Sequence, residues 1–173
     1  MSLHNKPIGF ECFLSDNQDG SYTNHFAHLF ESLSMEDYTW YVTYSENYCS
    51  DPQSPHHVDH FLPEGVYSGK ELLDLITERP QYYILQLSMY AVPSGVPFAP
   101  EKIKVYKDYL ESAAELAFFS GDSIVSFYAK DEAILKNIFA SAKHHYTNEA
   151  SESCIHEPTL ITAGTDGRTE FYV

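Results

Sequence analysis

Apolar positions along the chain follow two patterns, one typical of strands and one typical of helices. Runs of apolar and aromatic residues predict strands over residues 8–14, 38–44, 82–92, 115–120 and 123–130. Gly121-Asp122 separates the last two runs, and such a pair between strands predicts a hairpin. Both strands of this hairpin are apolar on both faces, so we expect them inside a covered sheet.

Helical spacing occurs in four segments. The clearest follows Asp131, a capping residue, and has a stripe made of Ile134, Leu135, Ile138, Phe139 and Ala142. A second begins at the capping box Ser68-Gly69-Lys70-Glu71 and ends at Pro80. The remaining two are a helix whose apolar positions are 26, 29, 30 and 33, and a helix over about residues 101–112.

Two segments show neither pattern. Residues 45–66 have no period and contain three prolines, which predicts a long loop. Residues 147–153 are polar and predict a linker. After it, residues 159–163 and 168–173 predict a second hairpin around Gly164-Thr165-Asp166-Gly167.

The predicted element order is β-α-β-α-β-α-β-β-α-β-β. Helices alternate with strands, but two hairpins prevent an all-parallel sheet. We therefore predict an α/β fold of the α+β type, with a mixed sheet of about six or seven strands and four helices packed on it. The chain of 173 residues has no composition break, so residues 1–173 are expected to form a single globular domain.

Charge narrows the classes of partner. The net charge is −15, and residues 1–79, with 13 acidic and 3 basic side chains, carry −10 of it. A field of this sign repels phosphate backbones and anionic lipids, so we expect no nucleic-acid or membrane partner. A basic protein is the partner that such a surface would attract. Nothing in the sequence sets the oligomeric state.

The cysteines and the first ten residues indicate the cellular compartment of the protein. Cys12, Cys49 and Cys154 form no close pair, which argues against a disulfide framework or a zinc site built on cysteines. Residues 1–10 lack a basic segment followed by an apolar one, and no apolar run approaches the length needed to span a bilayer. We expect a cytoplasmic protein, with Cys12 a buried, inert thiol in its strand.

Histidines supply the sharpest chemical candidates. His56 and His60 stand four apart, a spacing that on a helix would place both imidazoles on one face, with His57 and Asp59 as further metal ligands. Pro55 and the absence of an apolar period favour a solvated loop instead. Other histidines occur as the pair His25 and His28 and as the pair His144 and His145. For the first pair metal binding is an alternative, but we favour partly exposed helix residues. We interpret the second pair as groups that complement a helix dipole.

No nucleotide-binding loop, dinucleotide fingerprint, hydrolase elbow or kinase signature occurs in the chain. We therefore expect no cofactor.

Several segments, taken in order, resemble an uncharacterised bacterial (bacillus-type) domain-of-unknown-function family, number 2691. The residues that carry the resemblance are Tyr38-Thr39-Trp40-Tyr41, Gly69-Lys70-Glu71-Leu72, Tyr82-Tyr83-Ile84-Leu85, the helix at 106–110 and Asp166-Gly167-Arg168-Thr169. The resemblance implies a bacterial cytoplasmic protein. It implies no activity and no site residues.

Our leading functional hypothesis is a non-catalytic acidic protein–protein interaction module, comparable by analogy to immunity or inhibitor proteins. Tyr44, Tyr48 and Tyr67 lie in the acidic first part of the chain and are the candidate partner-binding residues. Two alternatives stay open: a metal-dependent enzyme that uses the segment His56 to His60, and a sensor domain that binds a small ligand.

Overall fold

The computed structural model describes residues 6–13, 26–51, 54–78, 82–121, 124–146, 148–151 and 154–162. For residues 48–51, 54–59, 82–83, 148–151 and 154–156 it describes the backbone alone. Two predicted features fall outside these ranges: His25 of the first predicted helix, and the second strand of the C-terminal hairpin.

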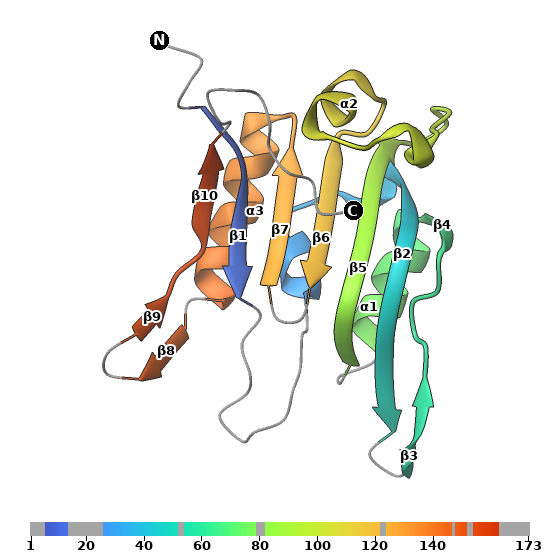
Figure 1. The fold of residues 1–173 in the computed structure, drawn as a ribbon, viewed down its shortest axis with the longest axis vertical. Helices are drawn as coiled ribbons and strands as arrows, with labels where there is room; N and C mark the ends of the chain where they lie inside the picture. Colours follow the sequence, from blue (N-terminus) through green and yellow to red (C-terminus); the bar gives the residue numbers. More distant parts are fainter. Residues whose placement is uncertain are drawn as a thin grey trace.

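The molecule is built on one eight-stranded sheet (Figure 1). Seven strands follow one another in the order β10-β1-β7-β6-β5-β2-β3, and β4 also pairs with β2. Their bounds are β1 (Pro7–Phe13), β2 (Tyr38–Asp51), β3 (Ser54–Asp59), β4 (Gly65–Ser68), β5 (Tyr82–Pro93), β6 (Leu116–Gly121), β7 (Ile124–Ala129) and β10 (Thr159–Thr162). A separate hairpin joins β8 (Asn148–Ser151) to β9 (Cys154–His156).

Helices α1 (Gly69–Glu78) and α3 (Glu132–His145) lie on one side of the sheet (Figure 1). Two 3₁₀ turns, η2 (Ala27–Phe30) and η3 (Met35–Asp37), contact these helices on the same side. A third 3₁₀ turn, η4 (Pro100–Lys102), and the short helix α2 (Tyr106–Glu111) lie at one end of the sheet. Among the described residues, no helix is both long and apolar enough to cross a membrane.

Two separate apolar cores result, because alternate residues of each strand point to opposite faces. The larger core lies between the sheet and the helices α1 and α3, and it is rich in fully buried aromatic residues such as Phe10, Trp40 and Phe118. The smaller core lies on the other face, under α2, where Tyr106 and Tyr109 of the helix cover strand residues such as Tyr90. We call these the helix face and the α2 face.

Local signals placed the helix starts as the sequence predicted. The Glu71 carboxylate accepts hydrogen bonds from the amide and the hydroxyl of Ser68 at 2.8 and 2.7 Å, which completes the capping box of α1. The Asp131 carboxylate caps α3 by accepting from the amides of Ala133 and Ile134 at 2.7 and 3.2 Å. The hairpin of β6 and β7 is also confirmed.

The structure corrects three features of the predicted architecture. The sheet is not mixed, since every strand pairing among the described residues is antiparallel. Three α-helices are present there instead of four, because the described part of the first predicted helix is only the 3₁₀ turn η2. Consequently the predicted element order is wrong: β2, β3 and β4 follow one another directly, and β8 and β9 replace the predicted linker.

The predicted loop over residues 45–66 is the largest error. β2 continues to Asp51, and β3 and β4 both return along it as antiparallel partners. The apolar period fails here because the strand has polar residues on both faces, so alternation gives no signal. Pro55 is tolerated within β3 because β3 is an edge strand, and the side of an edge strand without a neighbour needs no amide donor.

Asn47 is the buried residue that fixes the connection between β3 and β4. It is 1% exposed, and its side-chain amide donates to the Leu62 carbonyl at 2.8 Å and to Ser45 Oγ. Its side-chain carbonyl accepts from the amides of Phe61 and Leu62 at 3.0 and 3.3 Å. Phe61 and Leu62 are both buried, and this one side chain thus provides hydrogen-bond partners for their amides and for the Leu62 carbonyl.

We expect Asn47→Ala to lower the free energy of unfolding by about 3 kcal/mol, since it removes these bonds and leaves buried polar groups without them. Urea unfolding followed by circular dichroism measures the change. Asn137→Ala, an exposed position on α3, is the matched control and should change stability by less than about 0.5 kcal/mol. Equal effects of the two substitutions would contradict this role for Asn47.

Candidate functional site

Two places in the described structure bring chemically useful side chains together. The first is the half of the α2 face that α2 does not cover. The faces of β2 are set by Ser45 and Asn47, which both bond to the backbone of Leu62, a residue of the helix-face core. Tyr44 and Glu46 alternate with them and therefore point to the opposite face.

Strand register arranges this surface as two rows that run across five strands, from β2 to β1. The first row consists of Tyr44, Ser88, Phe119, Ser126 and Glu11. The second row consists of Glu46, Gln86, Gly121, Ile124 and Phe13. We call these ten residues the open face. Neighbouring strands are about 4.8 Å apart, so each row is about 19 Å long.

The aromatic end of one row lies beside the acidic end of the other. Tyr44 is the β2 end of the first row and Glu11 its β1 end, whereas in the second row Glu46 is at the β2 end and Phe13 at the β1 end. Aromatic rings and carboxylates therefore occupy alternate corners of the open face. Tyr44, Ile124 and Phe13 are 42%, 43% and 43% exposed, which is high for large apolar side chains on a sheet.

Between the corners the surface is hollowed. A depression of about 450 Å³ is lined by residues of both rows together with Leu85, Leu87 and Ser120. Glu11 accepts a hydrogen bond from the Ser126 hydroxyl at 3.3 Å, so one carboxylate is already oriented toward the middle of the sheet. None of the ten residues of the open face carries a positive charge.

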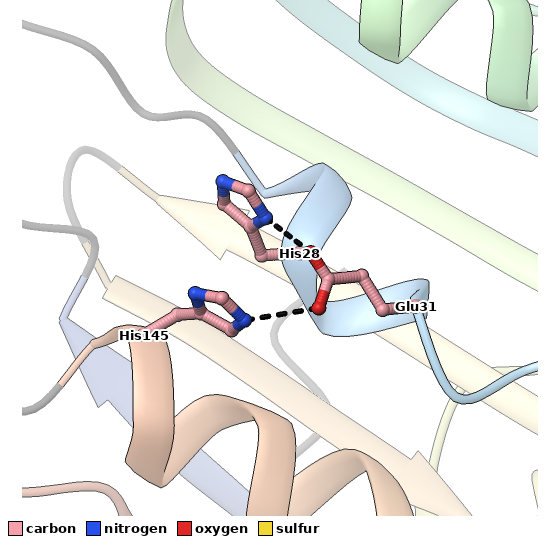
Figure 2. A group of neighbouring side chains, drawn as sticks. All are labelled: His28, Glu31 and His145. Atoms are coloured by element: carbon pink, nitrogen blue, oxygen red, sulfur yellow. Dashed lines mark hydrogen bonds and ion pairs between the residues drawn. The ribbon is translucent and has the colours of Figure 1, made fainter.

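The second place is a cluster of His28, Glu31 and His145 on the helix side (Figure 2). His28 and Glu31 belong to the turn at η2, and His145 is the last residue of α3. Nδ1 of His28 lies 2.5 Å from Oε1 of Glu31, and Nε2 of His145 lies 3.0 Å from Oε2. The two imidazole rings stack, with centroids 4.4 Å apart and planes 12° from parallel.

Glu31 is the common partner of both histidines. The hydrogen bond with His28 lowers the pKa of the Glu31 carboxyl, partial desolvation opposes this effect, and His145 lowers the pKa further. Glu31 is therefore an ionised acceptor at neutral pH, with two imidazoles directed at its two oxygens (Figure 2).

Sequence reasoning missed this cluster. Glu31 and His145 are 114 residues apart in the chain, and no local spacing connects them. The position of His145 at the end of α3 already had a sufficient explanation in the helix dipole. The only local signal was the spacing of His28 and Glu31, because side chains three residues apart lie next to each other on a helix.

The histidine segment that offers candidate metal ligands, and that the sequence predicts to be a solvated loop, is mostly a strand, so its backbone differs from the helix that a shared face would require. His56, His57 and Asp59 lie on β3, where the structure describes only the backbone, and His60 follows the strand as an exposed residue. Positions four apart on a strand are separated by about 13 Å, against about 6 Å on a helix. The helix face on which His56 and His60 would meet does not form.

The three predicted partner-binding tyrosines do not share one described surface. Tyr44 lies on the open face. Tyr67 is opposite Trp40 in the pairing of β4 with β2, packs against the helix-face core, and donates its hydroxyl to the Pro63 carbonyl at 2.7 Å. Tyr48 belongs to β2, where its backbone pairs with Tyr83 and its side chain lies outside the described residues.

Comparison with known proteins places the chain in a family. A family model described as a protein of unknown function, DUF2691, matches residues 13–172. The chain belongs to this family. No curated protein and no solved structure matches it significantly. The matched residues include both helix-side helices, the histidine cluster and all of the open face except Glu11, and the family description assigns none of them an activity.

Cys12 lies directly behind the open face, on the helix side of β1, and is 2% exposed. Burial, with a smaller contribution from the charge of Glu11, raises the pKa of its thiol to about 12. We expect iodoacetamide at pH 8 to alkylate Cys12 more than about 100-fold more slowly in the native protein than in urea, since the thiolate is the nucleophile. Mass spectrometry of the peptide that contains Cys12 measures this rate separately from the other cysteines. Equal rates in the two conditions would contradict the burial of Cys12.

Proposed function

We propose that this protein is a non-catalytic binding module that receives a basic segment of a partner protein on the open face. The observation that carries the proposal is the alternation of aromatic rings and carboxylates at the four corners of that face. Each corner offers either a large apolar contact or a negative charge, and the hollow between them can accept side chains of the partner.

The apolar part of the open face supports a binding role on energetic grounds. Phe13, Tyr44 and Ile124 together leave apolar surface exposed next to a hollow. Burial of such surface is the main favourable term in protein association, and aromatic residues are enriched among the residues that dominate binding energy. A protein segment suits a surface of about 19 Å across better than a small ligand, which would contact one end of it only.

The charge of the molecule supports a basic partner. Glu11 and Glu46 stand at opposite corners of the face, and both belong to residues 1–79, which carry −10 of the net charge of −15. Opposite charges on a partner would be drawn into contact at an increased rate, and this effect weakens as salt is added. Two cationic side chains about 20 Å apart, the diagonal of the face, would satisfy both carboxylates and fix the orientation of the segment.

Paired charge variants test the proposal. The double substitution Glu11→Lys with Glu46→Lys reverses both carboxylates of the open face. Glu36→Lys with Glu78→Lys makes the same change in net charge at exposed positions on the η3 and α1 side. Affinity capture from the native host at low salt, followed by a direct titration with the purified partner, compares both variants with wild type.

We expect wild type and the control to bind one basic partner, and the open-face variant to bind it at least about 30-fold more weakly, as loss of two charge pairs predicts. Tyr44→Ser should weaken binding without changing its salt dependence. Recovery of no basic partner, or equal losses in the two charge variants, would overturn the proposal.

A further inference from the structure

We propose that His28, Glu31 and His145 form a binding site for a divalent transition metal ion of the zinc class. These residues offer two imidazole nitrogens and one carboxylate oxygen, and the three ligand atoms lie within 4.8 Å of one another. The site is separate from the open face, because η2 and α3 lie on the helix side of the sheet.

The donor set selects the class of metal. Two imidazoles and one carboxylate suit zinc and its first-row neighbours, whereas calcium and magnesium prefer oxygen ligands alone. Three protein ligands leave a fourth position of a tetrahedral ion open to water or to another group. A site of this kind is therefore expected to prefer Zn²⁺ strongly over Mg²⁺.

The geometry is close to the one a metal needs. Ligand atoms around a tetrahedral zinc ion are about 3.4 Å apart, as bond lengths near 2.1 Å require. His28 Nδ1 and His145 Nε2 face the two oxygens of Glu31 at 2.5 and 3.0 Å (Figure 2). Small rotations of these three side chains would move the ligand atoms apart enough to admit the ion. About half of the Glu31 side chain is exposed, so solvent has access.

The backbone on both sides of the site is held in place, which lowers the cost of assembling the ligands. Leu29 and Phe30, between the two η2 ligands, are buried in the helix-face core. Ala142 of α3 is buried in the same core, and η2 and α3 contact each other directly. The ligands therefore project from two packed elements, and a bound ion would link η2 to the end of α3.

Zinc titration of the chain without an affinity tag tests the site. The protein is first treated with a chelator, and Zn²⁺ is then added in competition with a chromogenic chelator of known affinity. We expect wild type to bind one ion that His28→Ala and His145→Ala bind at least 10-fold more weakly. Glu31→Gln, which keeps the size of the side chain, should also weaken binding. His60→Ala, an exposed histidine outside the cluster, should leave the affinity of this ion unchanged.

Thermal unfolding provides an independent readout and a check on folding. Zn²⁺ should raise the Tm of wild type and of His60→Ala, Mg²⁺ should not, and His145→Ala should fold without the zinc-dependent shift. Absence of competitive zinc binding by wild type would overturn the assignment. So would equal zinc affinity in wild type, His28→Ala and His145→Ala, because the ion would then be held by other histidines.

Discussion

The structure depends on one constraint: an antiparallel sheet has two faces that can be covered, and the helices of the described chain cover one face and only part of the other. α1, α3 and two 3₁₀ turns cover the central strands of the helix face, where Phe10, Trp40 and Phe118 are fully buried. On the other face, α2 and its flanking turns cover one end. Where α2 stops, the side chains of the sheet change from tyrosine-rich core to the mixed polar and aromatic rows of the open face.

This change is visible within single strands. On β7, Tyr128 belongs to the core under α2, Ser126 is half-buried, and Ile124 is 43% exposed, although all three point to the same face. Serine and glutamine in the middle of the rows limit the exposed apolar area, and Phe119 there is buried, while the exposed aromatic residues are at the corners. A surface with this composition is compatible with water when free and still gains from burial on binding, which is the property that the proposed function requires.

The two candidate sites use the two sides of the sheet differently. The open face is a consequence of register, since antiparallel pairing alone aligns Tyr44 with Glu11 across five strands. The histidine cluster is a consequence of helix packing, since the contact between η2 and α3 brings His145 to Glu31. The helix-face core holds the strands of the sheet in place and also holds η2 and α3 against them. Both candidate sites therefore depend on this one core.

The sequence by itself determined the elements whose signals are local. Ser68 and Glu71 mark the start of α1, Asp131 that of α3, and Gly121-Asp122 the hairpin, because the atoms that form each feature lie within a few residues of one another. The sequence pattern did not predict the part of β2 beyond Tyr44. There the strand is formed by pairing with β5 and β3 and by the bonds of Asn47 to Phe61 and Leu62. Only the tertiary structure decided the strand order, the exposure of Tyr44 against the partial burial of Tyr67, and the meeting of His28 with His145. Each of these results from contacts between residues far apart in the chain, for which a linear pattern carries no signal.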